Sequence, residues 1–129
     1  MQKVPLISII DDDESVRRAT KNLVRSLGFE AHTFASAEDF LGSPRAAETA
    51  CVISDIQMPA MSGVELQEHL AARGQRTPII FITAFPNERT QARVMNAGAV
   101  CYLAKPFEGQ RLVRCIDAAL ALGREAAGA

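Results

Sequence analysis

The stretch that decides the fold is Cys51-Val52-Ile53-Ser54-Asp55-Ile56-Gln57-Met58-Pro59. It begins as a short apolar, β-branched run, which is typical of a strand buried on both faces of a parallel sheet. The run ends at the carboxylate of Asp55, and Pro59 four residues later cannot continue strand pairing. Open α/β sheets bind ligands beyond the carboxyl ends of their strands, so Asp55 lies where a functional residue is expected.

The bulk composition is that of one ordinary globular domain. The chain has 129 residues, of which 48% are hydrophobic and 22% charged, and its net charge is −1. This length is enough for a single domain with its own core. The near-neutral charge argues against a nucleic-acid-binding or membrane-binding surface, and no apolar run approaches the roughly 18 residues of a spanning helix. The N-terminus has no signal-peptide pattern, so we expect a cytoplasmic protein without membrane contact.

The three cysteines, Cys51, Cys101 and Cys115, are far apart and lie in apolar surroundings. An odd number of cysteines at such separations does not match a disulfide or zinc framework. We therefore expect three buried, reduced thiols that act as small hydrophobic side chains.

Short apolar runs alternate with helical patterns along the chain. Strands are expected at residues 6–10, 30–34, 51–54, 78–82 and 99–103. Helices are expected at about residues 15–27, 36–41, 62–74, 88–97 and 108–122. This alternation predicts an α/β fold with a parallel sheet covered by helices on both faces. The expected domain spans residues 1–122, and residues 123–129 are expected to form a tail or the start of a linker.

Polar residues fall at the carboxyl ends of four of these strands. They are Asp11-Asp12-Asp13, Asp55, Thr83 and Lys105. The carboxyl ends of parallel strands lie on one edge of the sheet, so we expect these residues to converge. Clustered carboxylates repel one another unless a cation joins them, and oxygen ligands of this kind suit Mg²⁺ paired with a phosphate. A lysine and a hydroxyl at the same edge complete a set that predicts phosphoryl transfer.

These segments resemble the signatures of response-regulator receiver domains, the phosphoacceptor half of two-component signalling. The resemblance covers residues 5–122 and rests on Ile9-Ile10-Asp11-Asp12-Asp13, Asp55-Ile56-Gln57-Met58-Pro59 with Gly63, Ile82-Thr83-Ala84 and Lys105-Pro106-Phe107. The wording around residues 55–63 and 97–99 is similar to receivers that carry a helix-turn-helix DNA-binding output domain. The resemblance implies a flavodoxin-like, doubly wound, five-stranded parallel sheet with strand order 2-1-3-4-5 and five helices.

For the site, the resemblance implies that Asp55 accepts a phosphoryl group from a histidine kinase. Mg²⁺ would be held by Asp11, Asp12, Asp55 and the backbone carbonyl of Gln57. Thr83 and Lys105 would bind the phosphoryl oxygens, while Asp13 would have a supporting role at most. Such a domain is not an enzyme in the usual sense, because it catalyses only its own phosphorylation and dephosphorylation.

The resemblance also implies a switch and an output. Tyr102 would change rotamer together with Thr83, and the Lys105–Pro106 bond would be cis. Phosphorylation would then promote homodimer formation or partner binding through residues 88–97, 99–103 and the helix from 108. The candidates for apolar contact on that face are Val94, Met95, Leu112 and Val113. The expected output is transcription, with DNA bound only by an output domain that this chain does not contain.

Two other interpretations stay open from the residues alone. Asp11-Asp12-Asp13-Glu14-Ser15 also fits the D-x-D-x-[ST] start of an aspartate-nucleophile phosphatase of the haloacid-dehalogenase type, with Asp11 as the nucleophile. That family needs a further acidic pair after the lysine, where this chain offers only Asp117 within a helical pattern. The second alternative is an α/β interaction module without a metal site, which failure to bind Mg²⁺ would favour.

Overall fold

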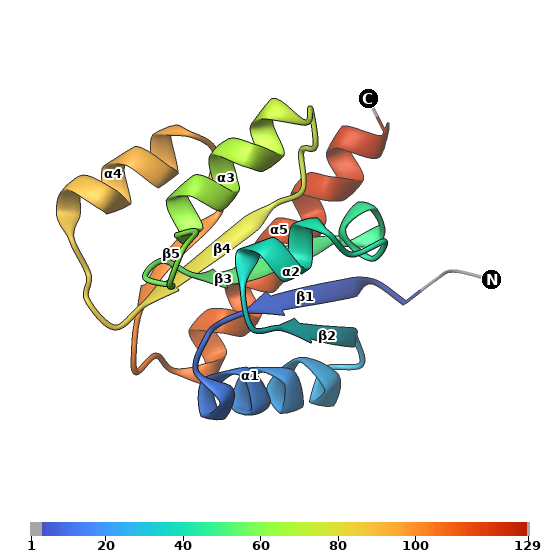
Figure 1. The fold of residues 1–129 in the computed structure, drawn as a ribbon. Coiled ribbons are helices and arrows are strands. Elements are labelled where there is room, and N and C mark those ends of the chain that lie inside the picture. The colour runs from blue at the N-terminus through green and yellow to red at the C-terminus, as the bar shows by residue number, and fades with distance from the viewer. Residues whose placement is uncertain (1–3, 129) are drawn as a thin grey trace.

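The structure, a computed structural model, describes residues 4–128 (Figure 1). The strands are β1 (Leu6–Ile10), β2 (Glu30–Phe34), β3 (Cys51–Asp55), β4 (Ile79–Thr83) and β5 (Cys101–Ala104). The helices are α1 (Glu14–Ser26), α2 (Ala37–Leu41), α3 (Gly63–Ala72), α4 (Glu88–Asn96) and α5 (Gly109–Gly128), with a short 3₁₀ turn η1 (Ala46–Glu48). The strands form one parallel sheet in the order β2-β1-β3-β4-β5. The predicted fold class is therefore confirmed.

Helices cover both faces of the sheet, as Figure 1 shows. One face packs against α1 and α5, and the other packs against α2, α3 and α4. Successive side chains of a strand point to opposite faces, so β3 sends Ile53 into the first core and Val52 into the second. All residues of β1, β3 and β4 are buried. This burial explains why these three strands are mostly apolar in sequence, without alternating polar positions.

The helices begin at the polar residues that the sequence offers as caps. Ser62 and Glu65 form the predicted capping box at the start of α3. The side chains of Ser36 and Asn87 accept backbone N–H donors at the starts of α2 and α4. Caps of this kind fix where each helix starts relative to the strand before it, and thus the length of each loop along the functional edge.

All predicted boundaries but the end of the last helix lie within two residues of the structure, and two of the differences have an identifiable cause. β5 starts at Cys101 instead of residue 99, because the Ala99 N–H donates to the carbonyl of Val94 and closes the end of α4. The last helix continues to Gly128, past the expected end at residue 122, because one glycine costs a helix only about 1 kcal/mol. Although α5 has 20 residues, neither it nor another helix among the described residues is long and apolar enough to cross a membrane.

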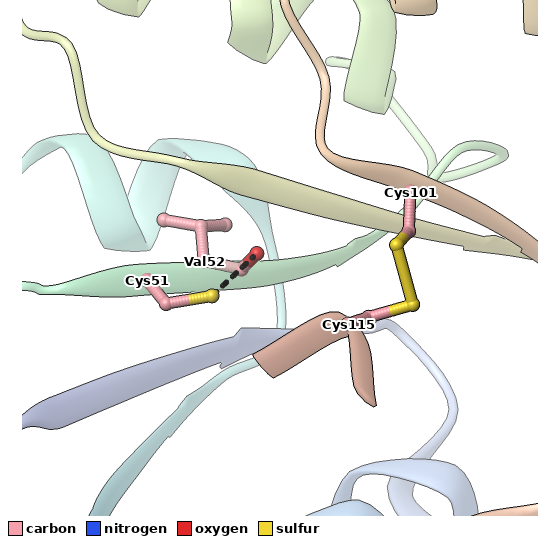
Figure 2. Close-up of a disulfide and its surroundings, with 4 residues drawn as sticks. All are labelled: Cys51, Val52, Cys101 and Cys115. Atoms are coloured by element: carbon pink, nitrogen blue, oxygen red, sulfur yellow. Dashed lines mark hydrogen bonds between the residues drawn. A yellow bond between two sulfur atoms is a disulfide. The ribbon is translucent and has the colours of Figure 1, made fainter. Parts of the chain in front are cut away.

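The prediction of three unbonded cysteines is wrong for two of them. Cys101 and Cys115 are joined in a disulfide between β5 and α5, with their Cα atoms 6.1 Å apart (Figure 2). The two cysteines are 14 residues apart, on a strand and on the helix that follows it. The sequence pattern did not show that their side chains would face each other. Cys51 is buried and free, as predicted. Burial raises the pKa of its thiol to about 12.

Candidate functional site

The site lies at the carboxyl edge of the sheet, where four chain segments meet. Asp11 follows β1, Asp55 ends β3, Thr83 ends β4, and Lys105 follows β5. β3 lies between β1 and β4, so Asp55 occupies the middle of this edge. The peptide bond between Lys105 and Pro106 is cis. The topology thus brings together residues that are up to 94 positions apart in the sequence.

Lys105 links the two buried carboxylates. Its Nζ donates to Asp11 Oδ2 at 3.0 Å and lies 3.4 Å from Asp55 Oδ2. The side chain of Lys105 is 17% exposed, while those of Asp11 and Asp55 are 0% and 8% exposed. At such low exposure, an ion pair is less screened by solvent and salt than a surface pair.

Asp11 accepts hydrogen bonds at both carboxylate oxygens and at its backbone carbonyl. Its Oδ1 accepts the N–H of Asp13 at 2.9 Å, its Oδ2 accepts from Lys105, and its backbone carbonyl accepts from the Arg17 guanidinium at 2.7 Å. Asp13 caps α1 by accepting the N–H groups of Ser15 and Val16. Asp13 therefore serves the helix start, while Arg17 anchors the loop, a role that the helical pattern of the sequence did not reveal.

Asp55 is the carboxylate with an unused oxygen. Its Oδ1 is buried and has no hydrogen-bond partner among residues 4–128. Burial and the negative charge of Asp11 together raise the pKa of Asp55, and they outweigh the nearby ammonium of Lys105. Burial alone would lower the pKa of Lys105, but its hydrogen bond to Asp11 and the charges of Asp11 and Asp55 outweigh this and raise it. The pocket thus combines a lysine whose charged form is stabilised with an aspartate whose charged form is destabilised.

The acidic residues at this edge fit a divalent cation. Asp11, Asp12 and Asp55 each offer a carboxylate oxygen, and these oxygens lie within 4.8 Å of one another. Asp12 is exposed, whereas the other two are buried, so one side of the group remains open to solvent. An oxygen-only donor set with an open side suits Mg²⁺, which keeps several waters and binds through few carboxylates. The unpartnered Oδ1 of Asp55 supplies an independent reason for a cation here.

Thr83 lies beside this group but is held by other partners. Its Oγ1 donates to Gln57 Oε1 at 2.6 Å and accepts the N–H of Phe85 at 3.0 Å. The sequence predicted a role for the backbone carbonyl of Gln57, and the side-chain contact had no signal in the spacing. Tyr102 on β5 is half-buried, and its hydroxyl accepts the N–H of Asn87 at 3.1 Å. Thr83 and Tyr102 therefore lie on neighbouring strands, each in a hydrogen bond to the β4–α4 loop.

Gly63 packs directly against the strand end that carries Asp55. Its N–H donates to the carbonyl of Ile56 at 2.8 Å. A Cβ at this position would clash with the backbone carbonyl oxygen of Asp55 and lie 3.0 Å from the ring of Phe81. Only glycine allows α3 to approach the β3 backbone so closely. The first residue of α3 thus helps to hold Asp55 in place.

Part of the expected contact face is buried. Val94 and Leu112 are 0% exposed and belong to the two cores, so the prediction that they contact a partner is wrong. Both positions point inward because they are the apolar sides of amphipathic helices. Met95 is 38% exposed, and Val113 is partly exposed. These two residues are the remaining apolar candidates on α4 and α5.

The phosphatase alternative lacks its second acidic group. Asp117 is exposed on α5, and in the part of the chain that the structure describes it does not belong to the metal-compatible group of Asp11, Asp12 and Asp55. Asp11, the nucleophile in that alternative, already uses both carboxylate oxygens in contacts with Asp13 and Lys105. The arrangement favours Asp55 as the reactive carboxylate.

Proteins of a known family are similar to this chain in sequence and in structure. The response regulator receiver domain family matches residues 7–117. The transcriptional regulatory protein TdiR of Thauera aromatica is 38% identical over 94% of this chain and 53% of its own length. The transcriptional regulatory protein FixJ of Bradyrhizobium diazoefficiens is 35% identical over 94% of this chain and 59% of its own length. The chain thus spans between half and three fifths of these curated relatives.

Solved structures extend the likeness to the whole fold. The response regulator StyR has a TM-score of 0.90 at 44% identity, covering 98% of this chain and 64% of that one. The structure described as FixJ-N has a TM-score of 0.82 at 33% identity, covering 94% of this chain and 96% of that one. The phosphatase alternative finds no support in these relatives. The chain belongs to the family of response regulator receiver domains.

Proposed function

We propose that Asp55 is the phosphoacceptor of this receiver domain and takes a phosphoryl group from a histidine kinase. The observation that carries the proposal is the environment of its carboxylate: Oδ1 is buried without a partner, and Oδ2 faces Lys105 at 3.4 Å. The negative charge of such a carboxylate is poorly compensated in the resting state, so forming a bond to phosphorus, which disperses that charge, is favourable. The raised pKa of Asp55, caused by burial and by Asp11, agrees with this.

The transfer itself is a displacement at phosphorus. One carboxylate oxygen of Asp55 forms the new P–O bond while the P–N bond to the kinase histidine breaks, and that electron pair leaves with the imidazole. Lys105 provides a fixed positive charge beside the oxygens of the transferring group. Thr83 provides a hydroxyl donor from the neighbouring strand once it releases Gln57. Because the domain turns over only its own carboxylate, it is not an enzyme acting on a separate substrate.

Asp11, Asp12, Asp55 and the backbone carbonyl of Gln57 would hold Mg²⁺ in this site. The ion would supply positive charge that offsets the repulsion between the carboxylates and the incoming phosphoryl oxygens. Asp11 is already oriented for this by Arg17, Asp13 and Lys105, so little reorganisation of its side chain is needed. Asp12 is exposed and lies on the open side of the site, from which a phosphoryl donor would approach.

Mass spectrometry after incubation with acetyl phosphate and Mg²⁺ tests the assignment. The wild type should gain one phosphoryl group, and Asp55→Asn should gain none. Asp13→Asn is the matched control, because asparagine caps a helix as well as aspartate does and Asp13 serves α1. Full labelling of Asp55→Asn, with the group on Asp11, would refute the proposal and support the phosphatase alternative.

The proposed output is a change on the α4–β5–α5 face. If the hydroxyl of Thr83 moves to a phosphoryl oxygen, it gives up its bond to Gln57, and the ring of Tyr102 can occupy the vacated space. Such a rotamer change has two discrete states, as a switch requires. It would alter the surface near Met95 and Val113, through which the domain would form a homodimer or bind a partner.

Sedimentation with and without beryllofluoride tests this coupling. The wild type should associate further when beryllofluoride and Mg²⁺ are present, and Thr83→Ala should not. Tyr102→Phe is a useful companion, since it removes only the hydroxyl that accepts from Asn87. An equal response of the wild type and Thr83→Ala would rule out a pathway through the threonine.

The wider role follows from the relatives. TdiR and FixJ are named as transcriptional regulatory proteins, and each is longer than this chain. By this likeness the whole protein would regulate transcription from the cytoplasm, with DNA contacted by an output domain outside the chain. The receiver would occupy residues 1–122, with residues 123–129 leading out of it. The helical backbone from 123 to 128 would make that exit a continuation of α5.

A further inference from the structure

The three thiols of this chain lie in unlike surroundings. Cys101 and Cys115 face each other across β5 and α5 with a Cα separation of 6.1 Å, within the range that a disulfide requires (Figure 2). Cys51 is free and buried on β3, and burial raises the pKa of its thiol to about 12. A thiol that stays protonated and inaccessible does not react. Thiol redox chemistry in the described part of the chain is therefore confined to one pair.

We propose that Cys101 and Cys115 are a reversible dithiol–disulfide site, oxidised by a low-molecular-weight disulfide such as oxidised glutathione. The inference rests on the cytoplasmic location proposed above. Disulfides in such compartments are transient and usually catalytic or redox-sensing, because thiol reductants keep structural ones open. The cross-link is thus a state of the domain that the redox poise selects.

The exposure of the two cysteines determines which of them reacts first with oxidised glutathione. Cys101 is partly exposed, whereas Cys115 is only 6% exposed. The Cys101 thiolate attacks one glutathione sulfur, the glutathione S–S bond breaks, and one glutathione leaves as a thiolate. The Cys115 thiolate then attacks the Cys101 sulfur and releases the second glutathione. Two electrons pass from the pair to glutathione, and the two protons end on the two glutathione thiols.

The cross-link encloses the segment of the chain that serves the site. Residues 101–115 include Tyr102, Lys105 and the whole β5–α5 loop. Cys101 contacts the core beneath α5, while Tyr102 contacts the core on the opposite face of the sheet. A bond from Cys101 to α5 therefore restrains β5 on the α5 face of the sheet and does not occupy the space of the Tyr102 ring on the other face. The oxidised domain should keep this segment more rigid than the reduced domain.

The first test counts thiols. Reduced native protein is incubated with oxidised glutathione, quenched in acid, and alkylated with N-ethylmaleimide in denaturant before intact mass measurement. The wild type should retain a single reactive thiol, Cys51, and the Cys51→Ala control should retain none. Dithiothreitol without denaturant should restore all thiols. A lasting glutathione adduct on Cys101, or a disulfide that opens only after unfolding, would overturn the proposal.

The second test measures the rigidity of the cross-linked segment. Amides in residues 101–115 should exchange hydrogen more slowly in the oxidised wild type, and its melting temperature should rise by on the order of 10 °C. Cys101→Ser and Cys101→Ala should show no response to the oxidant in either measurement. Equal hydrogen exchange in the oxidised and reduced wild type would show that the disulfide does not rigidify residues 101–115. These readouts do not require phosphorylation of Asp55, so they are independent of the proposed phosphoryl transfer.

Discussion

Replacing Gly63 with alanine tests whether the approach of α3 to β3 positions Asp55. The added Cβ would overlap the backbone carbonyl oxygen of Asp55 and lie 3.0 Å from Phe81 Cε1 and 3.1 Å from Ile56 Cα. Two of these three atoms belong to the backbone and the third to a fully buried ring, so none can move aside freely. Either α3 or the end of β3 must shift.

The size of the effect follows from two opposing contributions. Overpacking in a well-packed core costs about 1–3 kcal/mol. Restricting the unfolded chain by Gly→Ala returns about 0.4–1 kcal/mol. We expect a net loss of about 1–2 kcal/mol in the free energy of unfolding, or roughly 3–10 °C in melting temperature for a domain of this size. Phosphorylation by acetyl phosphate should slow by about 100-fold, because a displacement near 1 Å at a reacting group has that effect.

Gly109→Ala is the matched control for this substitution. Gly109 is also the first residue of its helix, so the change in helix propensity is the same. A Cβ there would meet only Leu23 Cδ2 at 3.8 Å, an ordinary contact. Urea unfolding and the labelling rate should therefore be unchanged or slightly improved in Gly109→Ala. If both variants unfold at the same urea concentration, the close approach at Gly63 does not determine the position of Asp55.

Three further outcomes follow from the charges of the site. Asp55→Asn should stabilise the metal-free domain at neutral pH. A carboxyl group whose pKa is raised on folding stabilises the folded state below its unfolded pKa of 3.8, and this stabilisation is lost as the pH rises through the folded pKa. The higher melting temperature of Asp55→Asn relative to wild type should therefore disappear in melts at acid pH. Mg²⁺ at ten times its dissociation constant should add about 1.4 kcal/mol to wild-type stability by mass action, and Asp12→Ala should lose most of that gain in thermal melts. Lys105→Met should destabilise the metal-free domain by about 3 kcal/mol in urea, because it leaves two buried carboxylates without their cation, and an unchanged midpoint would contradict that role.

Most of the fold is predictable from local patterns because each pattern has one structural cause. The mostly apolar runs at β1, β3 and β4 arise from burial on both faces, and the capping box at Ser62 arises from the unpaired N–H groups of a helix start. The ends of β5 and α5 were less predictable. Ala99 is apolar and suits a strand, but its N–H is taken by the end of α4. Local preference cannot anticipate such competition between neighbouring elements.

The residues of the site are predictable as a set, whereas their contacts are not. Strand ends place Asp11, Asp55 and Lys105 on one edge, which topology alone requires. The bond from Thr83 to the side chain of Gln57 depends on the path of the β3–α3 loop, and the sequence spacing holds no trace of it. The pairing of Cys101 with Cys115 likewise depends on which helix covers β5.

The charge balance of the pocket explains why this chain would depend on a divalent cation. Three carboxylates and one ammonium, all ionised, carry −3 + 1 = −2 charges around one strand end. A phosphoryl group would bring further negative charge, so Lys105 alone would leave a site that repels the group we propose it receives. Burial first, and the charge of Asp11 second, raise the pKa of Asp55, and its Oδ1 has no hydrogen-bond partner among the described residues. Adding a second fixed ammonium would relieve the excess permanently, whereas an exchangeable cation relieves it only when bound. We therefore expect this site to need Mg²⁺, because Lys105 contacts only Asp11 and Asp55, two of its three acids.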